Sequence, residues 1–322
     1  MSLLEVRDLT VSLQTKRGRA NAVEDLSFDV SQGEILGIAG ESGSGKTMTA
    51  LTMIGLLPHR ARTSGSVKFQ GDEILGMAPK DIRSIRGKRI SMIFQDPMTS
   101  LHPMLTIQTQ LTEHIRHHLG LDKSASIEKA KELLEAVRIP DPVGALKAHP
   151  NQFSGGMRQR IAIAIALACE PELLLADEPT TALDVTVQAG ILRLLNRLRK
   201  ERNLSVLVIT HDLGVLSAVA DRLLVMYAGR EVESGHTFDL LRETRHPYTR
   251  GILDSLPDAD RPEASLSAIK GFPPELGAFA SGCAFNPRCS FAVENCKMTV
   301  PLAVVLADGH RFFCPIDPLA KP

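Results

Sequence analysis

The residues best suited to chemistry form one glycine-rich segment, Gly40-Glu-Ser-Gly-Ser-Gly-Lys46-Thr47. It matches the G-x-x-x-x-G-K-[ST] pattern, whose glycines let backbone N–H groups curl around a phosphate at the start of a helix. In such a loop the lysine reaches the β- and γ-phosphates, and the hydroxyl after it binds Mg²⁺. The segment therefore predicts a nucleoside triphosphate site with the contact residues Gly40, Ser42, Gly43, Ser44, Gly45, Lys46 and Thr47.

Two neighbouring carboxylates end the apolar run Leu173-Leu-Leu-Ala-Asp177-Glu178. At the carboxyl end of a strand, Asp177 is placed to hold Mg²⁺ through water, and Glu178 is placed to polarise the water that attacks a γ-phosphate. A positioned general base contributes about 10²–10⁴-fold to a rate. We therefore predict that Glu178 governs turnover and leaves nucleotide binding largely intact. A solvated acidic turn is the alternative.

A third segment, Phe153-Ser154-Gly155-Gly156-Met157, precedes a predicted helix at 161–167. A serine hydroxyl and two glycines at a helix N-terminus suit a second anion site. So short a string is weakly specific by itself. It gains meaning from its position shortly before the strand that carries Asp177 and Glu178.

The elements that would position these residues alternate along the chain. Apolar patterns predict strands at 3–13, 21–30, 33–39, 90–94, 173–176 and 204–209. Helical spacing covers 46–57, much of 104–139, and 187–200. Such alternation indicates an α/β sheet domain that carries a helical subdomain. Beyond Gly235, repeated prolines interrupt a segment of little periodicity, which predicts an irregular extension.

The composition is that of a globular protein without a dominant charge. The 322 residues include 37 Lys and Arg and 37 Asp and Glu, and this balance argues against a broad nucleic-acid-binding surface. The N-terminus lacks the layout of a signal peptide, and no apolar run approaches the ~18 residues of a membrane span. We expect the chain to stay in the cytoplasm and to act at a membrane only through partner subunits.

Over residues 1–235 these segments occur in an order that resembles the ATPases of the ABC family. The resemblance implies a P-loop ABC ATPase domain with a parallel core sheet, an antiparallel β subdomain and an inserted helical subdomain. It also implies that two subunits pair head to tail around ATP. In such a pair Ser154, Gly155 and Gly156 would contact the γ-phosphate of ATP on the partner's phosphate loop.

Three further residues take roles from the same resemblance. Gln95, in Phe94-Gln95-Asp96, resembles the glutamine that senses Mg²⁺ and the transmembrane partner. Asp184, in Ala182-Leu183-Asp184, resembles the loop that crosses the dimer interface, and His211 resembles the switch histidine that contacts the γ-phosphate. The catalytic residues that the sequence predicts are Lys46, Gln95, Glu178 and His211, and the predicted Mg²⁺ ligands are Thr47, Gln95 and Asp177.

Two positions depart from the family pattern. Met157 stands where the signature usually ends in glutamine, and a thioether cannot make the same hydrogen bonds. Leu13 stands where many relatives carry an aromatic residue that stacks on adenine. We expect the base to rest instead on Val23 or Arg19.

Longer strings resemble the ATPases of oligopeptide and dipeptide importers, and in particular the D-type member of their two non-identical ATPases. These strings lie at 95–103, 154–160, 177–184 and 246–250. The resemblance implies an ATPase domain at 1–240, with its helical subdomain at about 97–168, and an extension at 241–322. It further implies a second ATPase, two permease subunits and an extracytoplasmic peptide-binding protein as partners.

Four of the five cysteines lie in the extension, at Cys283, Cys289, Cys296 and Cys314. Their spacing matches neither zinc-finger pairs nor a ferredoxin run, and it leaves reduced thiols, zinc and iron–sulfur all open. The D-type ATPases carry a similar extension, and this resemblance implies that the four bind a [4Fe–4S] cluster. Cys169, at the end of an apolar helix, is interpreted as a buried core thiol.

Other functions share part of this pattern. Importers of nickel or of another small solute use the same ATPase motifs. A soluble ABC ATPase outside transport is a second alternative, although its usual paired ATPase units, long coiled coil or basic insertion are missing from the sequence. The Ser154-Gly-Gly segment and Glu178 argue against a P-loop kinase, and intact Lys46 and His211 argue against a catalytically dead scaffold.

Overall fold

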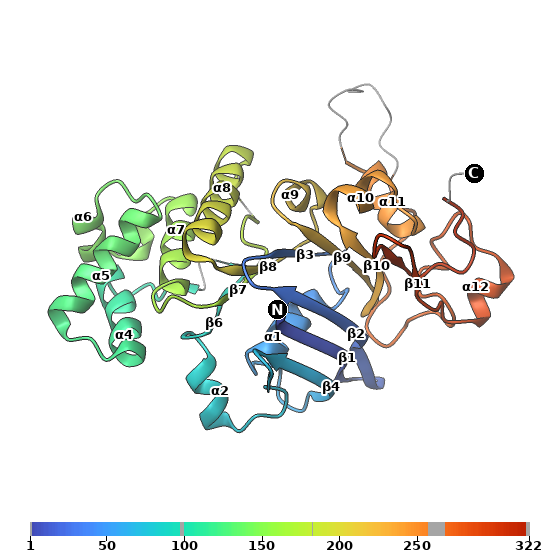
Figure 1. The fold of residues 1–322 in the computed structure, drawn as a ribbon, viewed down its shortest axis with the longest axis horizontal. Helices are drawn as coiled ribbons and strands as arrows, with labels where there is room; N and C mark the ends of the chain where they lie inside the picture. Colours follow the sequence, from blue (N-terminus) through green and yellow to red (C-terminus); the bar gives the residue numbers. More distant parts are fainter. Residues whose placement is uncertain (1, 97–99, 182, 257–267, 320–322) are drawn as a thin grey trace. The chain divides into compact units, whose positions relative to one another are not determined.

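The computed structural model describes residues 2–96, 100–181, 183–256 and 268–319. The chain forms two compact units (Figure 1). The first unit comprises residues 31–34 and 77–209, and the second comprises residues 2–30, 35–76 and those from 210 onwards.

A four-stranded sheet opens the second unit. Its strands lie in the order β2 (Gly18–Ser31), β1 (Ser2–Thr15), β4 (Arg62–Phe69) and β5 (Asp72–Glu73). β1 pairs antiparallel with β4, which sets Leu4 opposite Phe69 and Val6 opposite Val67. All four of these side chains are fully buried, because alternate residues of a strand share one face. The strands predicted at 3–13 and 21–30 are confirmed.

The second unit also holds the strands that flank the phosphate loop. They lie in the order β11 (Val304–Val305), β12 (Arg311–Phe312), β10 (Arg230–His236), β9 (Arg222–Tyr227) and β3 (Ile35–Ala39). β3 and β9 are parallel, whereas the other neighbours are antiparallel. Every residue of β3 is buried, as expected of a parallel strand covered on both faces.

In the part of the second unit that the structure describes, five helices accompany these strands. They are α1 (Lys46–Met53), α9 (Leu213–Ser217), α10 (Thr237–Arg242), α11 (Pro247–Asp254) and α12 (Glu294–Met298). The extension has little regular structure over its described residues, in line with its scattered prolines. It nevertheless supplies β11 and β12, and β12 continues the sheet by pairing with β10. Two-residue strands carry no periodicity, so the sequence could not predict them.

The first unit combines three parallel strands with a group of helices. The strands β8 (Ser205–Thr210), β7 (Leu173–Asp177) and β6 (Ile90–Ile93) lie in that order and are parallel. The helices among its described residues are α2 (Pro79–Ile85), α4 (Ile107–Leu119), α5 (Lys123–Ala136), α6 (Pro142–Lys147), α7 (Gly155–Ala166) and α8 (Val185–Arg202), with a 3₁₀ turn at Pro150–Gln152. Helices α4 to α7 pack on one another, which confirms the helical stretch predicted between the strands.

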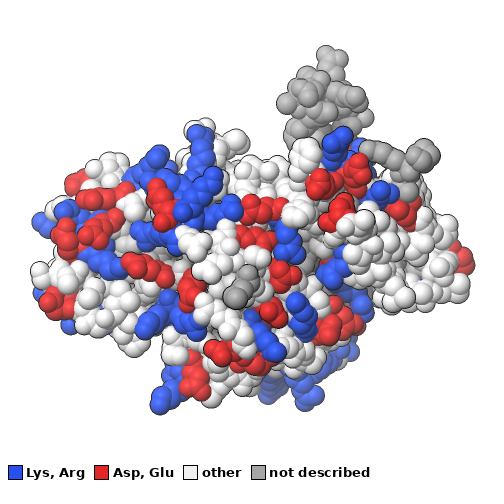
Figure 2. Space-filling view, viewed as in Figure 1, with Lys and Arg blue, Asp and Glu red and all other residues white. Residues whose placement is uncertain are grey.

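Local capping explains where these helices begin. The side chains of Thr106, Asp122 and Asp141 each accept a backbone N–H at the first turn of α4, α5 and α6 respectively. Such caps satisfy N–H groups that have no partner within the helix. The described part of the chain contains no helix both long and apolar enough to span a bilayer. On the face shown in Figure 2, Lys and Arg side chains lie interspersed with Asp and Glu, in keeping with the zero net charge.

Candidate functional site

The phosphate loop connects the end of β3 to the start of α1 in the second unit, where the sequence predicts it. Gly40 has φ +150°, and a Cβ there would lie 2.3 Å from the Met226 carbonyl oxygen. Gly45 has φ +100°, and a Cβ there would lie 2.4 Å from the Ala22 carbonyl oxygen. Both contacts are far below van der Waals distance, so only glycine permits the loop to approach β9 and β2 this closely.

Gly43, unlike Gly40 and Gly45, has open space beside it. It has φ +80°, and an added Cβ would meet nothing within 4 Å. Ser42 and Gly43 are exposed, whereas Ser44 and Gly45 are buried. The outer side of the loop is therefore open, next to the N-terminus of α1, where backbone N–H groups and the helix dipole favour an anion.

Lys46 is folded into the loop rather than extended into solvent. It is only 6% exposed. Its Nζ donates to the Gly40 carbonyl oxygen at 2.5 Å, to the Glu41 carbonyl oxygen at 2.9 Å and to Ser44 Oγ at 3.4 Å. The ammonium group thus lies among acceptors of the loop itself, and phosphate oxygens would add to or replace these partners.

Glu41, the second residue of the loop, has partners that the sequence analysis did not identify. Its carboxylate forms a two-pronged ion pair with Arg288, from Nη1 to Oε2 at 2.6 Å and from Nη2 to Oε1 at 3.0 Å. Its backbone N–H donates to the Tyr248 hydroxyl oxygen at 2.8 Å. Tyr248 belongs to the string at 246–250, which the sequence marked only by resemblance. Arg288 lies beside Cys289, and nothing in its spacing connected it with the loop.

The predicted carboxylates lie at the end of β7 in the first unit. Asp177 is 2% exposed and Glu178 is 8% exposed. Glu178 has φ +50°, a left-handed conformation that is uncommon for this residue and often marks a functional position. Its N–H donates to the Ile209 carbonyl oxygen at 2.8 Å, and its Oε2 accepts a 2.6 Å hydrogen bond from the Thr181 hydroxyl. The turn therefore fixes both the backbone and the carboxylate of Glu178.

The Ser154-Gly-Gly segment forms the N-terminus of α7, also in the first unit. Ser154 is exposed, and its Oγ accepts the Met157 N–H at 3.4 Å as the helix cap. A Cβ on Gly156 would lie 2.6 Å from Val187 Cγ1 of α8, so this glycine allows the two helices to pack. The serine lies exposed at the first turn of the helix, and its contact with an anion stays a prediction.

The other predicted residues follow strands or cap a helix. Gln95 is exposed just after β6, and His211 is exposed just after β8. Asp184 caps α8 by accepting the Val187 N–H at 2.9 Å. Ala182, in the same predicted loop, lies outside the described residues.

One expectation about the base-binding surface is wrong. Val23 is fully buried, and its Cγ2 would lie 3.2 Å from a Cβ at Gly45. It supports the phosphate loop from beneath and offers no face to adenine. Arg19 is exposed, with Nη1 donating to the carbonyl oxygens of Ser12 at 3.4 Å and of Arg60 at 3.3 Å. Its contact with a base stays a prediction.

The four cysteines of the extension are free thiols close enough to influence one another. Burial first, and then the charges of the other three cysteines, raise the pKa of the Cys283 thiol to about 11. The Cys283 N–H donates to the Cys296 carbonyl oxygen at 2.8 Å. Within the ranges that the structure describes, no group of three or more His, Cys, Asp or Glu side chains is arranged to hold a metal ion. Four thiols are suitable metal ligands, but in the described residues they are not arranged as a metal site.

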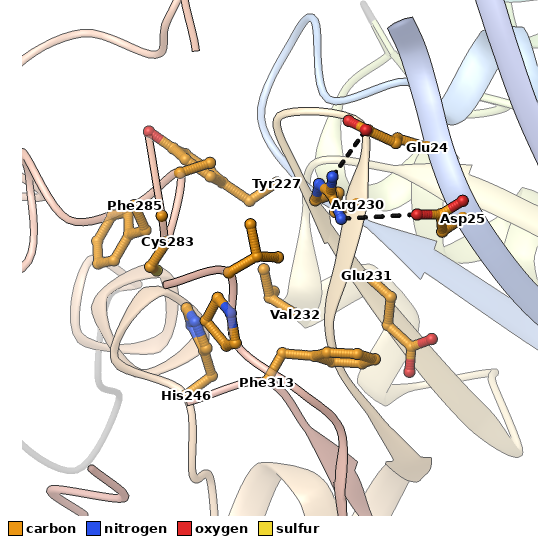
Figure 3. Close-up of a pocket in the computed structure, with 14 residues that line it drawn as sticks. Glu24, Asp25, Tyr227, Arg230, Glu231, Val232, His246, Cys283, Phe285 and Phe313 are labelled. Atoms are coloured by element: carbon orange, nitrogen blue, oxygen red, sulfur yellow. Dashed lines mark ion pairs between the residues drawn. The ribbon is translucent and has the colours of Figure 1, made fainter. Parts of the chain in front are cut away.

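Cys283 also lines a small cavity of about 80 Å³ in the second unit. Figure 3 shows Phe285, Cys283 and His246 on one side of this cavity and the ion pairs of Arg230 on the other. His246 is 1% exposed, and burial lowers the pKa of its ring to about 3.

Cys169, the fifth cysteine, is buried in the first unit, and burial raises the pKa of its thiol to about 11. Its burial and its raised pKa support the interpretation of Cys169 as a core residue.

Comparisons with known proteins agree with this fold and these motifs. The family model described as ABC transporter matches residues 23–181, and the one described as oligopeptide/dipeptide transporter, C-terminal region, matches residues 232–296. The solved dimeric structure of the ATP-binding cassette MJ0796, bound to ADP and Pi, is 26% identical and covers 73% of this chain and 98% of that one, with a TM-score of 0.65. The cbiO1 protein of Clostridium perfringens, part of the transporter complex cbiONQ, has the same TM-score at 25% identity, covering 75% of this chain and 91% of that one. The chain belongs to the ABC transporter ATPase family and has its P-loop fold.

Two curated relatives are more similar in sequence, and their names state the transported solute. The oligopeptide transport ATP-binding protein OppD of Salmonella typhimurium is 48% identical over 300 residues, which cover 93% of this chain and 90% of that protein. The dipeptide transport ATP-binding protein DppD of Bacillus subtilis is 46% identical over 314 residues, which cover 97% and 94% of the two chains.

Proposed function

We propose that this chain is the ATP-hydrolysing subunit that powers the import of dipeptides or oligopeptides across the cytoplasmic membrane. The observation that carries this proposal is the intact phosphate loop, with Lys46 held inside it, in a chain 48% identical to an oligopeptide transport ATP-binding protein over 93% of its length. The related proteins are named for peptide transport, so an importer of nickel or another small solute, or a soluble ABC ATPase, is not favoured.

The phosphate loop would bind the phosphates of ATP on its open side. Gly43 leaves room for a phosphate to approach the backbone, and Lys46 exchanges its loop carbonyl partners for β- and γ-phosphate oxygens. Hydroxyl, amide and carboxylate oxygens suit Mg²⁺. Thr47, Gln95 and Asp177 are the proposed ligands, directly or through water. Bound Mg²⁺ neutralises charge on the β- and γ-phosphates.

Glu178 is the proposed general base. It would accept a proton from a water molecule whose oxygen forms the new bond to the γ-phosphorus, while the bond to the ADP oxygen breaks. The products are ADP and inorganic phosphate. The Thr181 hydrogen bond supports this role, because it fixes the direction of the Glu178 carboxylate. His211 would contact the γ-phosphate as it leaves.

The second nucleotide-binding surface would come from a partner ATPase in a head-to-tail dimer. Ser154, Gly155 and Gly156 would contact the γ-phosphate on the partner's loop, and Asp184 would lie at the interface. The exposed Ser154 at the start of α7 supports this arrangement. The dimeric form of the related cassette MJ0796, with ADP and Pi bound, is consistent with it.

The remaining partners follow from the same proposal. They are a second, non-identical ATPase, two transmembrane permeases and, indirectly, an extracytoplasmic peptide-binding protein. The chain would act as a peripheral subunit on the cytoplasmic face of the membrane. Its ATPase domain would span residues 1–240, with the helical subdomain at about 97–168, and the extension residues 241–322.

The four cysteines of the extension remain the proposed ligands of a [4Fe–4S] cluster. The donor set and the mutual effect of the thiols on their pKa values support this proposal. The thiols would have to move closer to one another to bind a cluster, since they form no metal-binding group in the described residues. Protein purified without oxygen should contain iron and sulfide in equal amounts; zinc alone, or no metal, would refute the cluster.

Gentle purification from native membranes tests the function as a whole. The chain should co-purify with two permeases and a second ATPase, and peptide with its binding protein should stimulate ATP hydrolysis by the complex. Recovery in a complex without permeases would contradict the proposal. Stimulation by nickel and not by peptide would favour the alternative importer.

A further inference from the structure

The phosphate loop is fixed on one side by the C-terminal extension of the second unit. Glu41 is held twice, through its carboxylate by Arg288 and through its backbone N–H by the Tyr248 hydroxyl at 2.8 Å. Neither partner belongs to the phosphate-binding motif. They lie 247 and 207 residues further along the chain.

The ion pair with Arg288 is shielded and directional. The Arg288 side chain is 7% exposed and that of Glu41 is 27% exposed. Besides Glu41, the guanidinium donates to the carbonyl oxygens of Lys270 at 3.0 Å and Gly271 at 3.4 Å, and to the Tyr227 hydroxyl at 3.4 Å. All three guanidinium nitrogens are thus engaged. A two-pronged pair of this kind sets orientation as well as distance, which a lysine could not do.

Aromatic packing connects the same segment to the second partner of Glu41. The centroid of the Phe285 ring lies 5.2 Å from that of Tyr227 and 5.3 Å from that of Tyr248. The centroids of the two tyrosine rings are 4.6 Å apart. Phe285 and Arg288 both lie between Cys283 and Cys289. Figure 3 shows Phe285, Tyr227 and Cys283 at the same side of the cavity. Residues 283–289 therefore include one partner of Glu41, Arg288, and pack through Phe285 against the other, Tyr248.

Glu41 in turn supports the centre of the loop. Its carbonyl oxygen accepts the Ser44 N–H at 3.2 Å and a hydrogen bond from Lys46 Nζ at 2.9 Å. A displacement of Glu41 would move the carbonyl group that holds the lysine ammonium. It would also loosen the turn at Ser42 and Gly43, where the loop is open.

We propose that Arg288 is a positioning residue of the phosphate loop, through which residues 283–289 set the affinity of the loop for nucleotide phosphates. The proposal rests on the proposed function of the loop as a nucleotide site. Because coupling between two sites is reciprocal, nucleotide in the loop also stabilises residues 283–289. The extension is then part of the working ATPase and more than an appended segment.

The test is the affinity of the full-length chain for Mg-ADP, measured by titration calorimetry. Arg288→Ala and Glu41→Gln should each weaken ADP binding about tenfold, and the double variant should be no weaker than either, since both changes remove the same pair. Arg288→Lys should fall between wild type and Arg288→Ala. The matched control is Arg311→Ala. It breaks another Arg–carboxylate pair, with Glu231, that fastens the extension to β10 without touching the loop.

The possible results separate this inference from the proposed function. A wild-type chain that fails to bind ADP overturns the proposed nucleotide site itself. If the wild type binds and Arg288→Ala binds equally well, or if Arg311→Ala weakens binding as much, the positioning role is refuted. Should Arg288→Ala not fold, Arg288→Lys decides the question, because it keeps the charge and loses the two-pronged geometry. Wild-type affinity in that variant would overturn the proposal.

Discussion

The Thr181 hydroxyl donates a 2.6 Å hydrogen bond to Glu178 Oε2. The two residues lie on one turn, and the left-handed φ of Glu178, +50°, brings the carboxylate back toward the hydroxyl. A general base must present one oxygen to its water in a fixed direction. The Thr181 hydroxyl, bonded to one carboxylate oxygen, holds the carboxylate in such a direction.

Removing this hydroxyl should slow hydrolysis without weakening nucleotide binding. A hydrogen bond to a charged group contributes about 1.5–3 kcal/mol, so Thr181→Val should lower kcat by roughly tenfold or more. Thr181→Ser keeps the hydroxyl and should remain near wild type. Steady-state hydrolysis and ADP titration measure the two effects. A valine variant with wild-type kcat would show that the bond does not orient the base.

Replacing the base itself should have a larger effect. Glu178→Gln should reduce hydrolysis about 10²–10⁴-fold, because the amide cannot accept the proton from water. ATP should still bind and should hold the two ATPases together, which light scattering can detect. Near-normal hydrolysis by this variant would remove Glu178 as the base.

Two glycines of the phosphate loop should respond differently to alanine. Both have positive φ, which costs an alanine about 1–2 kcal/mol. At Gly45 the added Cβ would also lie 2.4 Å from a backbone oxygen, whereas at Gly43 it would meet nothing within 4 Å. Gly45→Ala should therefore lower the thermal unfolding temperature much more. Gly43→Ala should stay folded and lose affinity for ADP, since its methyl group enters the space proposed for phosphate. Equal losses of stability would contradict this distinction.

His246 should make the fold sensitive to acid. Its pKa is lowered to about 3 by burial, against about 6.5 in an unfolded chain. Between these values the unfolded state binds the extra proton, so stability falls as the pH drops below about 6.5. Between pH 7 and pH 5, the titration of His246 should lower the free energy of unfolding by about 2 kcal/mol.

The variant His246→Asn isolates this effect. Asparagine can still accept the Tyr248 N–H that His246 Nδ1 accepts at 3.1 Å, but it does not titrate. Urea unfolding at pH 7 and pH 5 should show a smaller loss of stability in the variant than in the wild type. An identical pH dependence for both would mean that the ring titrates with the same pKa in the folded and unfolded protein, which would contradict the effect of burial.

Local sequence patterns were sufficient for the core of the fold and for the phosphate loop. The loop at 40–47 and the strand before it depend on neighbouring residues, so their spacing is visible in one short window. The partners of Glu41 are not visible in any short window, because Tyr248 and Arg288 reach it across more than 200 residues of chain. No local pattern shows which distant side chain will meet a given residue.

The error at Val23 has a related cause. Alternation in β2 predicted a strand, but it did not tell which face would lie beneath Gly45. The turn around Glu178 shows the same limit. The adjacent carboxylates were visible in the sequence, whereas the positive φ that aims one of them depends on the Ile209 and Thr181 contacts.

Peptide uptake by membrane vesicles that contain the complete transporter tests the account most directly. With ATP on the side of this chain and a labelled peptide with its binding protein on the other, wild-type vesicles should accumulate peptide. Vesicles with Lys46→Ala or Glu178→Gln in this chain should accumulate almost none, although the permeases are unchanged. Uptake at the wild-type level with either variant would contradict the claim that ATP hydrolysed at these residues powers peptide import.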